Sequence, residues 1–576
     1  MAPASTTAKK IAFLAVTTLL SYGAHAASQP PVAAEHGMVV SAQRLATQVG
    51  VDVLKRGGNA FDAAVAVGYA LAVVYPAAGN LGGGGFLTAH TPDGRNVFID
   101  FREKAPLAAS ENMYLDAKGD VVPGLSVDGG LAVAVPGTVR GLELVREKFG
   151  TLSRADVIEP AIKLAEEGFA LEAGDALMLA FGSPRLARDP AAAAIFLKEG
   201  RAYRSGEVLV QKDLARVLRA IRDRGADGFY TGDVAEKLIA SVKAGGGVIV
   251  QADLDRIHPR ELKPIECDYR GFRVVSPPPP SSGGVVVCEI LGVLEGYPLK
   301  DYGFGSAKAV HVEIEAMRHA YVDRNAFLGD PDFVENPVEV LLSREHAAAI
   351  RAAIDPDRAA DSATLKPGVA PHEGANTTHY SIADESGAAV SVTYTLNEWF
   401  GAGIVAAGTG VLLNDEMDDF TSKLGVANIF GLVQGEANAI KPGKTPLSSM
   451  SPTIVLKDGK PIFVTGTPGG SRIPTVVVHT ILNVVDYGMN VQEAVDAPRV
   501  HNQWMPDRTL AERFAISPDT KRILEAMGHK FGPPQPANHA ASIMIGAPAL
   551  GAAPYGGNRF YGANDPRRGT GSAAGL

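Results

Sequence analysis

The stretch Asn376-Thr377-Thr378-His379-Tyr380-Ser381 opens a β pattern in the second half of this 576-residue chain. Strand-forming residues continue to Ile382, and Asp384-Glu385-Ser386-Gly387 has the composition of a turn. Residues 388–395 then resume the strand pattern with apolar side chains at alternate positions. The stretch therefore predicts a β-hairpin whose first strand begins with two hydroxyl side chains.

A threonine hydroxyl at the start of a strand needs a nearby base before it can act as a nucleophile. If the peptide bond before Thr377 is cut, the new α-amine, with an ordinary pKa of about 7.7–8.0, is such a base. An N-terminal threonine is one variant of the nucleophile–base arrangement. A Thr-Thr pair alone is more often ordinary sheet surface, so this reading depends on the rest of the sequence.

Other sequence blocks accompany the hairpin in a fixed order along the chain. They are Asn80–Phe86, Asp100–Glu103, Ala320–Arg324, Thr395–Asn397, Asn414–Phe420, Pro446–Thr453, Gly466–Arg472 and Asp565–Arg567. Together they resemble the γ-glutamyltransferase (γ-glutamyltranspeptidase) family of N-terminal nucleophile hydrolases. The resemblance covers nearly the whole chain after the first thirty or so residues.

This resemblance implies an α+β fold, an αββα sandwich of two mostly antiparallel sheets covered by helices. It implies cleavage at Asn376-Thr377 into a large subunit, 27–376, and a small catalytic subunit, 377–576, which stay interlocked as one unit. The matured enzyme would pass a γ-glutamyl group from glutathione or a similar donor to water, an amino acid or a peptide. No cofactor and no metal are implied.

The implied catalytic residues act on the donor's amide carbonyl. Thr377 would form the acyl-enzyme, and Thr395 would hold its hydroxyl. The N–H groups of Gly469 and Gly470, just before a predicted helix over 475–487, would stabilise the oxyanion.

The implied binding residues recognise both ends of an amino acid. Arg102, Ser448 and Ser449 would hold the donor's α-carboxylate, because a planar guanidinium can meet both carboxylate oxygens. Asn397, Glu416 and Asp419 would surround the α-ammonium. A solvated loop or a calcium site are the other interpretations of this acidic block.

A long loop over 425–444 is implied to be a lid over the substrate. It contains Asn428-Ile429-Phe430-Gly431-Leu432, whereas well-known bacterial members of the family carry tyrosine at the position of Phe430. If that tyrosine latches the lid to the residue matching Asn397, phenylalanine leaves the lid easier to open.

The composition excludes some partners. A net charge of −9, a pI near 5.9 and the lack of a basic stripe argue against nucleic acid. Lys9 and Lys10, the apolar run Ile11–Leu20 and Ala24-His25-Ala26 predict a signal peptide over 1–26. We therefore expect a periplasmic or secreted protein without a membrane anchor.

Local patterns give further expectations. Residues 38–75 are predicted to be helical with a break at Gly57-Gly58-Asn59, and residues 140–260 to be mostly helical. Gly82–Gly85 matches neither phosphate-binding motif and predicts a close backbone approach beside the active site, followed by strands over 86–89 and 97–101.

Two side-chain groups leave a choice. Cys267 and Cys288 could pair in an oxidising compartment. The unpaired state is favoured, because Cys288 lies in an apolar run and a chain of this size does not need the bridge. His311, Glu315 and His319 share one face of a helix over 311–325; a polar helix face is favoured over a metal site.

Two other functions are alternatives to the hypothesis of γ-glutamyl transfer. A glutaryl-cephalosporin-type acylase has the same fold and nucleophile, but its donor has no α-amine. The presence of Asp419, which is implied to bind that amine, therefore argues against an acylase. A periplasmic amino-acid-binding protein would show neither self-cleavage nor turnover.

Overall fold

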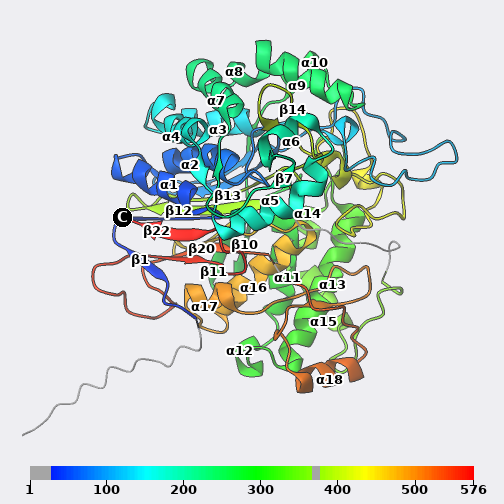
Figure 1. Ribbon diagram of the computed structural model, residues 1–576. Helices are drawn as coiled ribbons and strands as arrows, with labels where there is room; N and C mark the ends of the chain where they lie inside the picture. The colour runs from blue at the N-terminus through cyan, green and yellow to red at the C-terminus, as the bar shows by residue number, and fades with distance from the viewer. Residues whose placement is uncertain (1–27, 366–376, 537) are drawn as a thin grey trace, which may run out of the picture.

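Two stacked β-sheets form the centre of the molecule in this computed structural model, and helices cover both outer faces (Figure 1). The structure describes residues 28–365, 377–536 and 538–576. Each large sheet has seven strands, and every neighbouring pair within them is antiparallel. The predicted αββα sandwich is confirmed.

The first sheet contains the predicted hairpin at its centre. In spatial order its strands are β22 (Ser572–Gly575), β2 (Gly37–Ser41), β12 (Thr378–Asp384), β13 (Ala389–Thr395), β3 (Gly84–His90), β4 (Asn96–Asp100) and β9 (Arg260–Leu262). Thr378 pairs with Tyr394 across the hairpin. Both faces of β12 are buried, which places the start of the strand inside the molecule.

The second sheet lies against the first. In spatial order its strands are β1 (Val32–Ala34), β21 (Phe560–Asn564), β20 (Ala541–Ile545), β17 (Lys460–Thr465), β16 (Thr453–Lys457), β11 (Phe272–Ser276) and β10 (Ile265–Tyr269). Short two-stranded ribbons lie outside the sheets: β5 (Phe169–Ala170) with β8 (Val208–Leu209), β6 (Leu197–Lys198) with β7 (Arg201–Ala202), β14 (Val405–Ala406) with β15 (Val411–Leu412), and β18 (Val500–His501) with β19 (Leu510–Ala511). Both large sheets thus combine strands from before and after Thr377.

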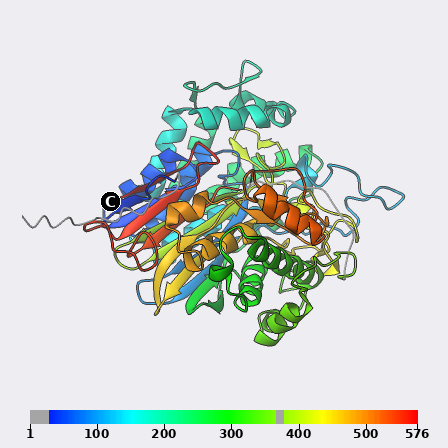
Figure 2. The same ribbon diagram turned by 90° about the horizontal axis from the view of Figure 1, so that it is seen from below.

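One helical layer covers the first sheet, as both views show (Figures 1 and 2). Its helices and those outside them are α1 (Arg44–Lys55), α2 (Ala60–Val74), α3 (Thr138–Phe149), α4 (Arg154–Glu167), α5 (Ala173–Leu186), α6 (Pro190–Phe196), α7 (Lys212–Arg224), α8 (Asp227–Tyr230), α9 (Gly232–Ala244) and α10 (Gln251–Arg256). Asn59 caps the alanine-rich α2 by accepting from the N–H groups of Phe61 and Asp62. Every residue of α2 is buried, so this helix fills the centre of the layer.

The other helical layer packs on the second sheet. It contains α11 (Gly283–Leu294), α12 (Leu299–Tyr302), α13 (Ala307–Phe327), α14 (Val338–Leu341), α15 (Arg344–Ala353), α16 (Ile473–Val485), α17 (Val491–Asp496) and α18 (Pro518–Ala526). Apolar side chains of α11, α13 and α16 share one buried cluster with β11, β16 and β17. None of the helices among the described residues is both long and apolar enough to span a bilayer.

The prediction of a helix over 38–75 is wrong for the first residues of that segment. Residues Gly37–Ser41 form the strand β2, which pairs with β12 and β22. Met38 and Val40 lie in the apolar layer between the two sheets, whereas Val39 faces α1 and α2. Burial on both faces hides the alternation that identifies a half-exposed strand.

Of the two states left open for the cysteines, the favoured unpaired one is also wrong. Cys267 on β10 and Cys288 on α11 form a disulfide, with their Cα atoms 5.9 Å apart. Cys288 is buried in an apolar cluster, as its sequence context predicted. The packing of α11 across β10 brings the two thiols together, and their separation of 21 residues does not reveal that contact.

Two predictions fall outside the described residues: the signal peptide over 1–26 and the structure around Asn376. The other predicted elements are confirmed in kind. Residues 140–260 are mostly helical, the predicted helix over 475–487 corresponds to α16, and residues 425–444 contain no α-helix or strand.

The C-terminal Asp565-Pro566-Arg567 block is a buried ion-pair centre. Asp565 is 0% exposed and accepts from the Nη2 of Arg499 at 3.0 Å and the Nη1 of Arg567 at 2.8 Å. Its pKa lies below the ordinary value, because the two arginines outweigh burial, which acts in the opposite direction. Removing a partner of a buried ion pair leaves an uncompensated charge.

We predict that Asp565→Ala lowers the free energy of unfolding by about 3–5 kcal/mol. Since the folded-state pKa is lowered, this contribution is present above the ordinary pKa of about 3.9 and is lost as pH falls. Thermal unfolding from about pH 3 to pH 7 should show the gap between wild type and variant closing in acid. Asp519→Ala, which removes an exposed ion pair with Arg522, is the control and should change stability by less than about 1 kcal/mol. A gap independent of pH would contradict the assignment.

Candidate active site

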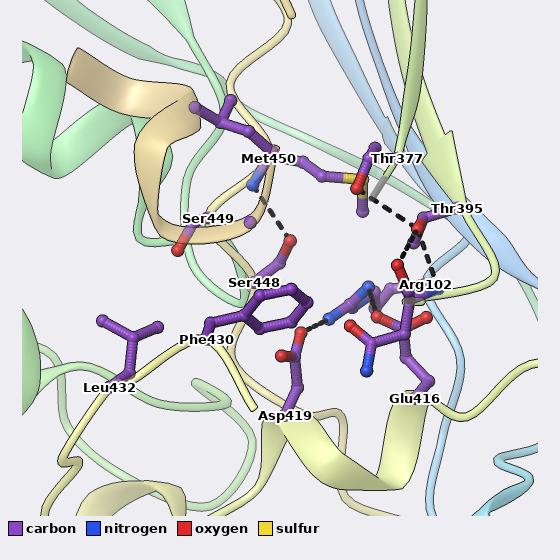
Figure 3. A pocket seen from close by; sticks show the side chains of 13 residues that line it. Arg102, Thr377, Thr395, Glu416, Asp419, Phe430, Leu432, Ser448, Ser449 and Met450 are labelled. Carbon is purple, nitrogen blue, oxygen red and sulfur yellow. Dashed lines mark hydrogen bonds and ion pairs between the residues drawn. The ribbon is translucent and has the colours of Figure 1, made fainter. Parts of the chain in front are cut away.

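A pocket at the start of β12 gathers most of the predicted site residues (Figure 3). It is lined by Arg102, Thr377, Thr395, Asn397, Glu416, Asp419, Phe430, Leu432, Ser448, Ser449, Met450, Gly470 and Ile473. Of the residues predicted for the site, only Gly469 does not line the pocket; it precedes Gly470 in the chain. Its lining combines charged, hydroxyl and apolar side chains around a small space.

The two predicted threonines face each other at the ends of the hairpin strands. The Oγ1 atoms of Thr377 and Thr395 are 3.2 Å apart, and Thr377 is 4% exposed. The N–H of Asn397 donates to Thr395 Oγ1 at 2.8 Å, which fixes that hydroxyl. The structure therefore places the Thr395 hydroxyl within hydrogen-bond distance of the Thr377 hydroxyl.

The backbone of the glycine-rich segment just before β3 lies close to the carbonyl group of Thr395. A Cβ atom on Gly83 would lie 2.0 Å from the Thr395 carbonyl oxygen, so no larger residue fits there. Asn80 Nδ2 donates to the same carbonyl at 2.9 Å. The predicted close backbone approach beside the site is confirmed.

Gly469 and Gly470 form the turn that enters α16. Both have positive φ angles, +130° and +55°, which favour glycine. A Cβ on Gly470 would lie 2.5 Å from the ring of Phe430. Within the described parts of the chain, neither N–H donates a hydrogen bond to a protein group. These N–H groups are therefore available to a ligand oxygen.

Arg102 lies among buried carboxyl groups below the threonines (Figure 3). Its Nη2 donates to Asp419 Oδ2 at 2.5 Å, its Nη1 donates to Glu416 Oε1, and Glu103 lies 3.7 Å from Nη1. Burial raises the pKa of Glu103 to about 7, and it also raises the pKa values of Glu416 and Asp419. One guanidinium shared among these carboxyl groups leaves the pocket suited to an additional cation.

Ser448 and Ser449 provide the opposite kind of contact. Ser448 Oγ accepts from the N–H of Met450 at 3.1 Å, and Ser449 Oγ accepts from Arg324 Nη2 at 3.1 Å. Because each oxygen already accepts a bond, its hydroxyl hydrogen is placed to donate to a ligand. Two such donors on one loop suit an anionic group.

Asn397 lines the pocket between Thr395 and Asp415 in its hydrogen-bond contacts. Its φ angle is +76°, and its Nδ2 donates to the carbonyl oxygen of Asp415 at 3.0 Å. With the amide nitrogen occupied, its side-chain oxygen is the atom that could meet an ammonium group.

The loop over 425–444 covers the pocket through Phe430. This side chain is 3% exposed, and its carbonyl oxygen accepts from Gln503 Nε2 at 3.2 Å. Neighbouring backbone bonds also hold the loop: the N–H of Ile429 donates to Asp418 Oδ2 at 2.8 Å. The loop is thus attached at several points besides the ring of Phe430.

The sequence missed several lining residues. Leu432, Met450 and Ile473 supply apolar walls, and Met450 directly follows the serine pair within a recognised block. Arg324 also belongs to a recognised block, but its contact with Ser449 depends on the tertiary structure. Membership of a recognised segment, or a place next to one, was the signal that the sequence offered for these residues.

The predicted polar face of α13 does not reach this pocket. His311 Nδ1 lies 2.7 Å from His529 Nε2, and possible ligand atoms of His311, Glu315 and His529 lie within 4.8 Å of one another. His319, named with them from the sequence, is not part of that group. These buried side chains bind one another and their neighbours: Arg318 Nε donates to Glu315 at 3.3 Å.

Comparison with known proteins adds independent evidence. A family model described as "Gamma-glutamyltranspeptidase" matches residues 46–575. The chain is 65% identical to a "Glutathione hydrolase proenzyme" of Pseudomonas sp. (strain A14), over 96% of this chain and 97% of that one. It is 48% identical to the protein of the same name from Escherichia coli (strain K12), over 95% and 93% of the two chains.

Among solved structures, the chain resembles a cephalosporin acylase from Bacillus halodurans. The TM-score is 0.83 at 29% sequence identity, over 97% of this chain and 98% of that one. The overall fold therefore does not by itself distinguish this chain from a cephalosporin acylase, and the pocket has to do so.

Proposed function

Since the chain belongs to the γ-glutamyltranspeptidase family, we propose that it is a glutathione hydrolase proenzyme that matures by cutting itself at Asn376-Thr377. The single observation that carries this proposal is the pairing of Thr377 with Thr395 in a pocket that has acidic and hydroxyl-donor sides. The acidic side suits an α-ammonium, and the donor side suits an α-carboxylate. A γ-glutamyl donor carries both groups on one carbon atom.

Maturation uses the same hydroxyl as turnover. Thr377 Oγ attacks the carbonyl carbon of Asn376, the C–N bond breaks, and the threonine nitrogen leaves as an amine. Water then cleaves the ester and releases the carboxyl end of a large subunit over 27–376. The small subunit, 377–576, keeps the free α-amine that serves as the base.

In turnover, Thr377 attacks the side-chain amide of the donor while its α-amine accepts the hydroxyl proton. The N–H groups of Gly469 and Gly470 stabilise the oxyanion, at about 3–4 kcal/mol per donor in measured cases. The amine of the leaving group departs with the proton. Water, an amino acid or a peptide then takes the γ-glutamyl group from the threonine.

Donor recognition divides between the two sides of the pocket. Arg102, Ser448 and Ser449 hold the α-carboxylate, whereas Asn397, Glu416 and Asp419 hold the α-ammonium. A glutaryl donor lacks the ammonium and would leave the buried Glu416 and Asp419 without a cation from the ligand. The pocket therefore favours a γ-glutamyl donor over a glutaryl donor.

We also propose that the protein is exported to the periplasm or beyond. The basic residues Lys9 and Lys10, the apolar run after them and the Ala24-His25-Ala26 site support a cleaved leader. Cell fractionation and N-terminal sequencing of the large subunit test this; a start near Ala27 is expected.

The decisive experiment combines a denaturing gel with a γ-glutamyl anilide assay. We expect purified protein to run as two fragments and to release the aniline from γ-glutamyl-4-nitroanilide. A glutaryl anilide should be a much poorer donor. An uncut and inactive chain would fit an amino-acid-binding protein instead, and preference for the glutaryl donor would fit an acylase.

The lid provides a test of water access to the acyl-enzyme. A tyrosine hydroxyl at position 430 adds a hydrogen bond worth about 0.5–1.5 kcal/mol net. We predict that the natural Phe430 enzyme gives a larger share of hydrolysis over transfer than Phe430→Tyr, by at most about tenfold. The bonds from Gln503 and Ile429 already hold the loop, which limits the effect.

The measurement follows free glutamate and the transfer product from one donor, with and without a dipeptide acceptor. Phe430→Leu serves as the control, because it keeps an apolar cover without adding a hydroxyl. An unchanged product ratio in Phe430→Tyr would show that this latch does not govern water access.

A further inference from the structure

Arg324 lies next to Ser449 of the serine pair, and its guanidinium donates hydrogen bonds to neutral side chains. It is 1% exposed on α13. Its partners are Ser282 Oγ at 3.0 Å from Nε, Asn325 Oδ1 and Gln434 Oε1 at 2.8 and 3.0 Å from Nη1, and Ser449 Oγ at 3.1 Å from Nη2. All of these acceptors are uncharged.

No carboxylate among the described residues lies within 4.0 Å of the Arg324 guanidinium. Arg318, on the same helix and equally buried, pairs with Glu315 and Asp507. Burial lowers the pKa of Arg324 to about 10, so the side chain remains charged at neutral pH. Asp419 attracts Arg324 without contacting it in an ion pair. A buried charge with no carboxylate in direct contact is costly, and a ligand that brings the opposite charge reduces that cost.

Two contacts of Arg324 connect it to the serine pair, which forms the side of the pocket suited to an anionic group. By donating to Ser449 Oγ, it directs the serine hydrogen away from itself. Ser282, which accepts from Arg324, donates its own hydroxyl to the Ser448 carbonyl oxygen at 2.7 Å. Arg324 thus fixes one serine side chain directly and the backbone of the other through Ser282.

A second chain of hydrogen bonds connects Arg324 to the acidic side of the pocket. Gln434 accepts from Arg324 and donates from its Nε2 to the Asp419 carbonyl oxygen at 2.9 Å. Arg102 alone cannot balance the negative charge of a bound carboxylate, because Glu416, Asp419 and Glu103 already surround it.

We propose that Arg324 is a positioning residue for the donor's α-carboxylate: it orients Ser449 as a donor and supplies the buried positive charge behind the serine pair. This inference rests on the proposed function, in which that serine pair binds the α-carboxylate. It assigns to Arg324 a part of substrate specificity and no part in bond breaking.

The test compares two donors that differ only in the α-carboxylate: γ-glutamyl-4-nitroanilide and 4-aminobutanoyl-4-nitroanilide. For Arg324→Met, we expect kcat/KM for the first donor to fall by about 10- to 100-fold, mainly through KM. The second donor should change less than about twofold. Arg324→Lys keeps the charge and should recover part of the loss. A merely structural role would reduce both donors equally and would overturn the proposal.

Arg318→Lys is the matched control, a conservative change at another buried arginine of α13, and should leave the ratio between the donors unchanged. If Arg324→Met fails to mature, Arg324→Lys and Ser449→Ala decide the question. Once Ser449 is alanine, Arg324→Lys should not alter the donor ratio further; an additive loss would refute coupling through Ser449. If the wild-type enzyme used both donors equally well, the carboxylate site of the proposed function would fail instead.

Discussion

Thr377→Ala is expected to leave one uncut chain that turns over no γ-glutamyl donor above background. In the proposed mechanism the same hydroxyl attacks in maturation and in turnover, so its removal should stop both reactions. Removal of a catalytic nucleophile in a hydrolase costs on the order of 10⁶-fold in kcat. A denaturing gel and the anilide assay measure the two losses separately.

Thr378→Ala is the matched neighbour for this prediction. The Thr378 hydroxyl is buried and has no hydrogen-bond partner among the described residues, and its strand partner is Tyr394. This variant should still mature, at least in part. Edman sequencing of the small fragment should begin at Thr377; any other first residue would reassign the nucleophile.

Arg102→Ala is expected to lower kcat/KM for γ-glutamyl-4-nitroanilide by about 30-fold to about 5,000-fold. That range corresponds to about 2–5 kcal/mol for the loss of a desolvated charge partner. Arg102 is 2% exposed and also pairs with Glu416 and Asp419. Its loss would therefore remove the proposed contact to the donor's carboxylate and the ion pairs with these two acids.

Arg102→Lys separates these two effects. Lysine keeps a positive charge among the acids but cannot meet both carboxylate oxygens in the manner of a guanidinium. We expect both variants to be cleaved into subunits and the lysine variant to retain part of the activity. Near-normal kinetics in Arg102→Ala would remove this residue from the donor site.

The hairpin over 378–395 was predictable because its residue pattern and turn are local. The partners of β12 were less accessible: β2 begins at Gly37, hundreds of residues earlier, and is buried on both faces. Local periodicity carries no information on such pairing, and it misassigned residues 38–41 to a helix. The same limit explains the cysteines, whose contact depends on how α11 crosses β10.

In the site, the sequence indicated residues through recognised blocks rather than through geometry. Thr377, Arg102 and the serine pair were assigned in this way, and the structure brings them into one pocket. Arg324 stood in such a block too, but no sequence pattern shows that its partners are neutral. That property emerges only when the buried neighbours of each charge can be identified.

The mixing of strands from both sides of Thr377 has a consequence for the life of the enzyme. Before cleavage, refolding is a first-order process within one chain; after cleavage, two separate polypeptides must meet to rebuild both sheets. Recovery of activity after denaturation should then depend on protein concentration for the cut enzyme, whereas the uncut Thr377→Ala chain should regain its fold at a rate independent of dilution. On the proposed maturation, the bond before Thr377 would be needed to reach the native state but not to keep it, and the cut enzyme would be maintained by a slow rate of unfolding.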